Sequence, residues 1–353
     1  MVMGIVCGLL LKSFASDISR IGGKLLLMYL CTTLIATVFS MTLSIILFHS
    51  GIPQVGTVTA AAGEGVSISL VDMIVGIIPK DLITPIVKRD MLQIIFMAFV
   101  FGTTINILGE KVSVLSRIAD VMNTLNLRII AMIARFIPIV AFLSMMSLIF
   151  SLGITSIYLL ERVILGQLIG AVLMITVYSI MILVVGKISP APFLRKIVSF
   201  LPVPASMGSS TATMPFTMKF CTDKMGAASS LSSFSIPLGA TVNMDGGCFY
   251  FAIFTILAAK MYGAAITPNF LLSLFIAIIA LSIGAPGVPG GAFVCLTLIM
   301  LSFGMPSEAA ALALGSESLV SIFRMTINII GDIAATTALA SNEKLLDGKV
   351  YQS

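Results

Sequence analysis

Polar side chains recur along one face of an apolar stretch near the end of the chain, residues 309–340. They are Glu317, Ser321, Arg324, Asn328 and Asp332. If the stretch is a helix, spacings of 4, 3, 4 and 4 residues place all five within an arc of roughly 80°. A charged side chain at membrane depth costs at least about 2.5 kcal/mol, so this stripe predicts a binding site or a polar cavity. The alternative is a purely structural network in which Arg324 bridges Glu317 and Asp332.

The composition indicates which class of protein carries this stripe. The 353 residues are 58% hydrophobic and 10% charged, with a mean hydropathy of +1.14. Soluble domains are far less apolar, so we predict an all-α polytopic membrane protein. The basic residues are scattered singly, which argues against a nucleic-acid surface despite the net charge of +5. His49 is the only histidine, and the five cysteines fall inside apolar runs without metal-site spacing.

Long apolar runs give the candidate membrane spans. They cover residues 1–13, 23–49, 87–108, 127–150, 157–186, 228–262 and 309–340. The first run is too short to cross about 30 Å of hydrocarbon, so we expect the sequence to start inside a helix. Basic residues are denser in alternate connections, which by the positive-inside rule places the C-terminus in the cytoplasm of a multi-pass cell-membrane protein. Residues 50–86 are then a loop on the outer side.

Two segments combine short apolar halves with helix-breaking residues. Residues 190–223 contain five prolines, and residues 266–306 are interrupted between Gly284 and Ala292. Each half is too short to cross a membrane alone, so both segments are predicted to be re-entrant hairpins. Paired interruptions of this kind are typical of transporter binding sites, because half-helix N-termini favour anions and unwound carbonyls favour cations. Two surface loops between ordinary short helices are the alternative.

The run 228–262 is interrupted by a segment from Gly239 to Gly247 that includes Asn243 and Asp245. This segment predicts a break that exposes backbone carbonyls beside a carboxylate. Hard oxygen ligands of this kind suit a small cation such as sodium. The alternative is that Asp245 is the buried partner of Arg324.

Taken together, these motifs resemble the dicarboxylate/amino acid:cation symporter family, to which the excitatory glutamate transporters belong. The matching motifs are Arg20-Ile-Gly-Gly-Lys24, Leu108-Gly-Glu-Lys111, Ser209-Ser-Thr-Ala-Thr-Met-Pro215, Asn243-Met-Asp-Gly246, Gly287-Val-Pro-Gly290, and Arg324 with Asn328 and Gly331-Asp332. The resemblance covers nearly the whole chain. It implies a glutamate-transporter-like fold with two re-entrant helical hairpins and a discontinuous seventh helix, here short of the first helix.

The resemblance also implies a domain division and an assembly. Residues 1–186 would be mainly scaffold and trimerisation helices, with one transport-domain helix near 87–108 or 23–49. Residues 187–345 would be the transport core, which moves against the scaffold of a homotrimer. The parts of this core are hairpin 1 at about 190–223, the broken helix at 228–262, hairpin 2 at about 266–306 and the last helix at 309–340.

Substrate-binding residues follow from the same resemblance. The first hairpin would hold one substrate carboxylate through Ser209, Ser210 and Thr211, and the second would close over it with Val288 and Gly290. Arg324 would clamp the second carboxylate with a bidentate geometry that lysine cannot supply. Asn328 would contact both substrate and sodium.

Three sodium sites are implied in the same way, and no cofactor other than these coupling ions is expected. The first would use Gly239, Asn243, Asn328 and Asp332. The second would use Thr241 and Met244 with carbonyls of the second hairpin. The third would use Tyr29, Thr32, Thr33, Asn243 and Asp245.

Departures from the family pattern bear on the substrate. Members that carry amino acids place an aspartate three residues before the arginine to pair with the substrate's ammonium, and Ser321 stands there. A serine cannot neutralise a buried ammonium, so a C4-dicarboxylate such as succinate, fumarate or malate is favoured. An acidic or neutral amino acid remains the alternative substrate. Met325 and Gly247 replace threonines, Glu317 replaces an aspartate, and Pro286 stiffens the second hairpin.

Two rival functions use the same residues. Asp245 and Asp332 could form the pair of an intramembrane aspartyl protease, but Ile329 replaces the first glycine of that motif. Re-entrant hairpins also build channels, but Arg324 would repel cations from a cation pore. We therefore predict a sodium-coupled symporter that works by alternating access, and no enzyme.

Overall fold

The computed structural model describes residues 17–54, 78–85, 155–284 and 290–353, together with isolated positions and short runs between 93 and 150. In these residues the named elements are all helices, which confirms the all-α prediction. Four helical stretches are long and apolar enough to cross a membrane: Ile21–Leu47, Tyr158–Val184, Ser229–Met261 and Leu319–Asn342. The predicted spans at 1–13, 87–108 and 127–150 fall outside the continuously described segments.

Long helices form the body of the structure. They are α2 (Asp17–Leu47), α8 (Thr155–Val184), α12 (Ser229–Val242), α13 (Asp245–Met261) and α16 (Ala311–Asn342). The apolar run 228–262 is divided here, because Asn243 and Met244 between α12 and α13 have non-helical backbone angles. The polar stripe lies on α16, a single unbroken helix.

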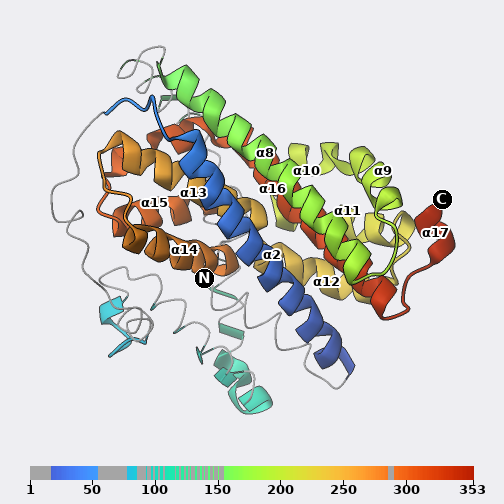
Figure 1. Ribbon diagram of the computed structural model, residues 1–353. Helices are drawn as coiled ribbons and strands as arrows, with labels where there is room; N and C mark the ends of the chain where they lie inside the picture. Colours follow the sequence, from blue (N-terminus) through green and yellow to red (C-terminus); the bar gives the residue numbers. More distant parts are fainter. Residues whose placement is uncertain are drawn as a thin grey trace.

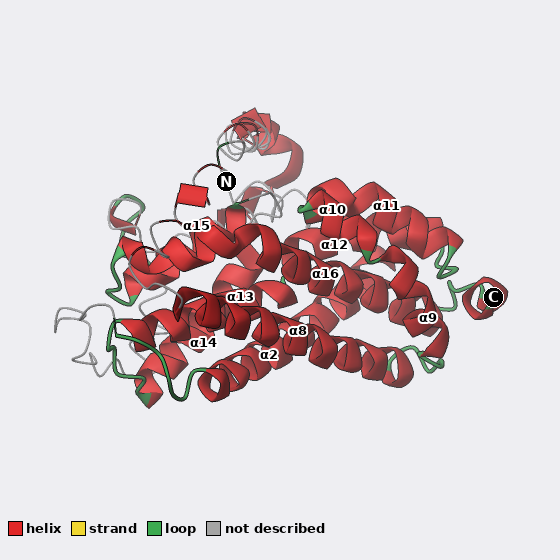
Figure 2. Cartoon of the chain, turned by 90° about the horizontal axis from the view of Figure 1, so that it is seen from above, coloured by secondary structure: helices red, strands yellow, loops and turns green. Residues whose placement is uncertain are grey.

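Shorter helices occupy the two ends of this body. Near one end lie α9 (Ala191–Phe200), α10 (Pro202–Met207) and α11 (Ser210–Asp223), and near the other lie α14 (Pro268–Gly284) and α15 (Gly291–Ser302) (Figures 1 and 2). The remaining elements are η2 (Gly109–Val112), η3 (Ser307–Ala310) and α17 (Gly348–Gln352). Residues 285–289, between α14 and α15, lie outside the described part of the chain. The predictions for Pro286 and Val288 therefore concern residues that the structure does not describe.

Helix α13 is the centre of the core. All of its residues except Lys260 are buried, and it packs against α2, α8, α14, α15 and α16. By contrast, α2 and α8 bury one face and expose apolar side chains such as Leu27, Ile46 and Val172 on the other. That division suits two helices at the periphery of a membrane-embedded bundle.

One contact establishes the direction of α2. The ammonium of Lys24 pairs with the Glu343 carboxylate and donates to Asn342 Oδ1, which joins the start of α2 to the end of α16. Lys24 is half-exposed, so the pair contributes little to stability. It shows, however, that the Leu47 end of α2 lies at the opposite end of the bundle.

Candidate functional site

The stripe on α16 faces the interior. Glu317, Arg324, Asn328 and Asp332 are each 5% exposed or less, while Ser321 is half-buried. Helix α16 packs here against α8, α12 and α13. Charged and amide groups are thus held inside the bundle, where each needs a partner.

Asn328 connects the stripe to the break between α12 and α13. The N-terminus of α13 has free backbone N–H groups and no side-chain cap of its own. Asn328, on α16, provides this cap, because its Oδ1 accepts a hydrogen bond from the N–H of Gly246 at 2.7 Å. Its Nδ2 donates to the sulfur of Met244 at 3.1 Å. A Cβ at Gly246 would collide with the backbone carbonyl of Arg324, so glycine permits this close approach.

Arg324 has an ion-pair partner on its own helix. Its guanidinium pairs with Glu317 Oε1 at 2.5 Å and lies 4.8 Å from the centre of the Tyr250 ring. Arg324 Nε and Glu317 Oε2 have no hydrogen-bond partner among the described residues. In the structural alternative Arg324 also bridges Asp332, but the structure gives Asp332 a different partner.

Asp332 receives its hydrogen bond from a neutral amide. Its Oδ1 accepts from Asn243 Nδ2 at 2.9 Å, and the same amide nitrogen is 3.2 Å from the carbonyl oxygen of Asn328. Gly239 lies so close that a Cβ there would collide with both the Asp332 carboxylate and the Tyr29 hydroxyl. The Oδ1 of Asn243 has no partner among the described residues. The residues predicted for the first sodium site are therefore neighbours.

Asp245 forms a second cluster with α2 and α8. Its Oδ1 accepts from Thr33 Oγ1 at 3.0 Å and its Oδ2 from the Tyr178 hydroxyl at 2.8 Å. In the part of the chain that the structure describes, the polar partners of Asp245 are hydroxyl groups of α2 and α8, and Arg324 is not among them. Thr32, also predicted here, is buried and donates to the carbonyl of Tyr29 at 3.0 Å.

Tyr178 is the residue of this cluster that the sequence analysis missed. It is fully buried on α8 and also lies 3.2 Å from the carbonyl oxygen of Ile327. The sequence offers one weak signal, a hydroxyl-bearing aromatic residue in the middle of an apolar span. Nothing local pairs that hydroxyl with Asp245, 67 positions away.

The first predicted hairpin contributes a serine beside the stripe. Ser209 caps α11 by accepting from the N–H of Ala212 at 3.2 Å. Ser210 is buried, and its hydroxyl donates to the sulfur of Met325 at 3.4 Å. Thr211 is exposed in the first turn of α11. Ser210 is therefore brought next to the residue that follows Arg324.

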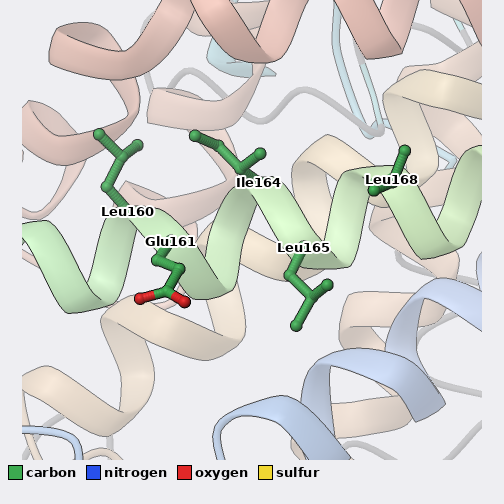
Figure 3. Close-up of a pocket in the computed structure, with 5 residues that line it drawn as sticks. All are labelled: Leu160, Glu161, Ile164, Leu165 and Leu168. Atoms are coloured by element: carbon green, nitrogen blue, oxygen red, sulfur yellow. The ribbon is translucent and has the colours of Figure 1, made fainter.

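Two other predicted residues are described by their local geometry. Thr241 is half-buried and donates to the carbonyl of Leu238, within α12, at 2.8 Å. Gly290 has φ of 78° and precedes α15, a backbone conformation that favours glycine. A surface pocket on α8 is a separate feature, lined by Leu160, Glu161, Ile164, Leu165 and Leu168 and including none of the predicted site residues (Figure 3).

Comparison with known proteins assigns the family. The profile of the sodium:dicarboxylate symporter family matches residues 1–342. The chain belongs to this family. The recognition from motifs is thereby confirmed, and membership in a family of transporters supports the prediction that the protein is no enzyme.

Three curated relatives illustrate how similar proteins are named. The "C4-dicarboxylate transport protein" of Bacillus subtilis is 27% identical over 355 residues, covering 97% of this chain and 83% of the relative. The "C4-dicarboxylate transport protein 1" of Pseudomonas paraeruginosa is 26% identical over 278 residues, covering 78% of this chain and 62% of the relative. The "Proton/glutamate-aspartate symporter" of Escherichia coli is 25% identical over 351 residues, covering 95% of this chain and 79% of the relative.

Proposed function

We propose that the protein is a secondary symporter that imports a small C4-dicarboxylate together with sodium by alternating access. The observation that carries this proposal is the setting of Arg324, which is 2% exposed on a helix without an acidic residue at position 321. A guanidinium has five N–H donors in a planar fork, and pairing with Glu317 at one nitrogen leaves capacity for a substrate carboxylate.

Ser321 supports a dicarboxylate over an amino acid. It lies one turn before Arg324 and carries no charge, so a substrate ammonium would be buried there without a counter-ion. Two of the three relatives described above are named C4-dicarboxylate transport proteins. An acidic amino acid is the alternative, which the name of the Escherichia coli relative favours.

Two buried aspartates, Asp332 and Asp245, support sodium as the coupling ion. Asp332 and Asp245 receive hydrogen bonds from neutral donors, namely Asn243, Thr33 and Tyr178. A buried carboxylate without a cation is costly, and binding of sodium would offset this cost. The Oδ1 of Asn243, which has no partner among the described residues, adds a hard oxygen ligand beside Asp332.

The arrangement of short helices supports the transport architecture. Helices α11 and α15, of 14 and 12 residues, would extend about 21 and 18 Å, too little to cross a membrane. We propose that the segments containing them are re-entrant hairpins, and that the break between α12 and α13 opens the seventh helix of the fold at the binding site. Because α2 and α8 pack against α13 and α16, they would move with residues 187–345 as one transport unit, which adds α8 to the single helix of residues 1–186 that the resemblance assigns to it.

The remaining parts of the proposal rest on family membership and on the sequence. The transport unit would move against the scaffold of a homotrimer in the lipid bilayer of the cell membrane. The C-terminus would lie in the cytoplasm, as the distribution of basic residues predicts.

Thermal stabilisation of the detergent-purified protein tests substrate and ion together. Succinate, fumarate, aspartate and glutamate would each be added with sodium, and again with choline in its place. A ligand that binds the folded state at 100 times its Kd raises the free energy of unfolding by about 2.7 kcal/mol. We expect succinate or fumarate to stabilise the protein only when sodium is present. Stabilisation by aspartate but not succinate would refute the dicarboxylate assignment, and equal shifts in choline would refute sodium coupling.

A further inference from the structure

A row of buried hydroxyl groups leads away from Asp245 along α2. Its members are Thr33, Thr37, Ser40 and Ser44, each 1% exposed or less. Spacings of 4, 3 and 4 residues place them on one face of the helix. The row starts at the Thr33 hydroxyl bonded to Asp245 and runs toward the Leu47 end of α2.

The hydroxyls of this row present their oxygens as acceptors. Thr37 donates to the carbonyl of Thr33 at 2.7 Å, Ser40 to that of Thr37 at 2.9 Å, and Ser44 to that of Ser40 at 2.6 Å. Each proton is therefore committed to the backbone of α2, while each oxygen keeps acceptor capacity, even at Thr37, whose hydroxyl also meets the Cys248 thiol. Neutral oxygens with committed protons are ligands for a cation and not for an anion.

Helix α13 supplies the opposite wall with small or polar residues. Asp245, Cys248, Ala252 and Thr255 recur at spacings of 3, 4 and 3 and are all buried. The first two contact α2, because Asp245 bonds to Thr33 and the Cys248 sulfur lies 4.0 Å from the Thr33 carbonyl oxygen. We call these four residues and the four hydroxyl residues of α2 the polar seam.

An unpartnered group lies at the far end of the polar seam. The Oγ1 of Thr255 is fully buried and has no hydrogen-bond partner among the described residues, unlike the hydroxyls of Thr37 and Ser44, which bond to their own helix. Helices α2 and α13 run side by side in the same direction (Figure 1). From the Thr33–Asp245 contact, Ser44 is about 16 Å along α2 and Thr255 about 15 Å along α13, so they lie at the same level.

A second unpartnered side chain lies near this level on α8. Gln167 is fully buried, and neither of its amide atoms has a partner among the described residues. The preceding residue, Gly166, lies against the side chains of Leu47 and Ile253, one from each wall of the polar seam. A buried amide without partners is costly in an apolar core, so this end of the polar seam is a place where a polar guest is stabilised.

We propose that the polar seam is an entry route by which the coupling cation reaches Asp245 from the Leu47 end of α2. This inference rests on the proposed sodium coupling and adds a path separate from the substrate site beside Arg324. Hydroxyl oxygens at successive turns replace the hydration shell of a small monovalent cation, and the Asp245 carboxylate ends the row. Apolar side chains at the same positions would fill the same space without solvating an ion.

The route is tested by charge movement after a sodium concentration jump. The charge movement is recorded from proteoliposomes on a solid-supported membrane, without substrate. The test variants are the double substitution Ser40→Ala with Ser44→Ala, and separately Thr255→Val. The matched control is Thr42→Ala, because the Thr42 hydroxyl is exposed on α2 and bonds to the Val38 carbonyl at 2.8 Å in the same way. Asp245→Asn tests whether the route ends at that carboxylate.

We expect each test variant to slow the charge movement about tenfold, as loss of hydrogen-bonding groups around a buried charge predicts. The sodium concentration at half-saturation should stay within about twofold, because a route affects rates and not equilibria. Asp245→Asn should reduce the amplitude of the movement, because only the sodium binding at Asp332 and Asn243 is left intact, and the control should match the wild type. Unchanged rates in the test variants, an equal slowing in the control, or full movement in Asp245→Asn would overturn the route. A wild-type protein without sodium-driven charge movement would refute sodium coupling and the route together.

Discussion

The buried pair of Arg324 and Glu317 gives the sharpest test of the site. Replacing Arg324 by methionine leaves the Glu317 carboxylate, which is 5% exposed, without its cation. Breaking a buried ion pair from one side costs about 3–5 kcal/mol. We therefore expect Arg324→Met to lower the free energy of unfolding by about that amount. Adding Glu317→Gln should recover most of the loss, because a neutral amide needs no counter-charge.

Dicarboxylate binding should follow a different pattern from stability. Removing one partner of a buried charge pair costs about 2–5 kcal/mol of binding energy, which corresponds to an increase in Kd of about 30-fold to several thousandfold. Both the single variant and the double variant should show this loss. Sodium should still stabilise both, because the Asn243 and Asp332 contact is unchanged.

Thermal unfolding of the purified variants, with succinate titrated in sodium, measures both quantities. Lys24→Met is the control for the loss of a cation. The lysine of the Lys24–Glu343 pair is half-exposed, so the pair should contribute at most about 1 kcal/mol to the free energy of unfolding. Undiminished succinate affinity in the double variant would refute the role of Arg324 as the carboxylate clamp. A double variant as unstable as Arg324→Met would refute the reasoning from an unpaired Glu317.

Three further predictions follow from other contacts. Ser321→Asp should bring aspartate binding and weaken succinate binding in the same titrations, and no gain for aspartate would show that this position does not discriminate. Tyr178→Phe should lower stability in choline by about 1.5–3 kcal/mol, because it removes a donor to a carboxylate, Asp245 Oδ2 at 2.8 Å; an unchanged melting temperature would contradict this. Burial raises the pKa of Tyr351 from 10.0 to about 12, and its hydroxyl donates to the Ser189 carbonyl at 2.7 Å. The stability advantage of wild type over Tyr351→Phe should be complete below pH 10 and shrink as the pH rises to about 12, and a constant difference across that range would refute it.

Local sequence patterns were sufficient to predict the family, the all-helical class and the polar stripe on the last helix. Helical periodicity is a property of neighbouring residues, so the positions of Glu317, Arg324 and Asp332 already predicted a shared face. The observed α16, Ala311–Asn342, agrees with the predicted helix 309–340 to within two residues at each end. The interruption of the run 228–262 was predicted for a similar reason, since glycine and polar residues weaken a helix wherever they occur.

Several partners between helices were decided only by the tertiary structure. The residues alone presented Asp245 as a sodium ligand or as a partner of Arg324, and the family resemblance grouped it with Thr33; packing bonds it to Thr33, 212 positions away, and adds Tyr178. Periodicity states which face of a helix is polar but not which helix lies against that face. The polar seam and the contact between Ser210 and Met325 depend on the same information, because both arise only where separate helices meet.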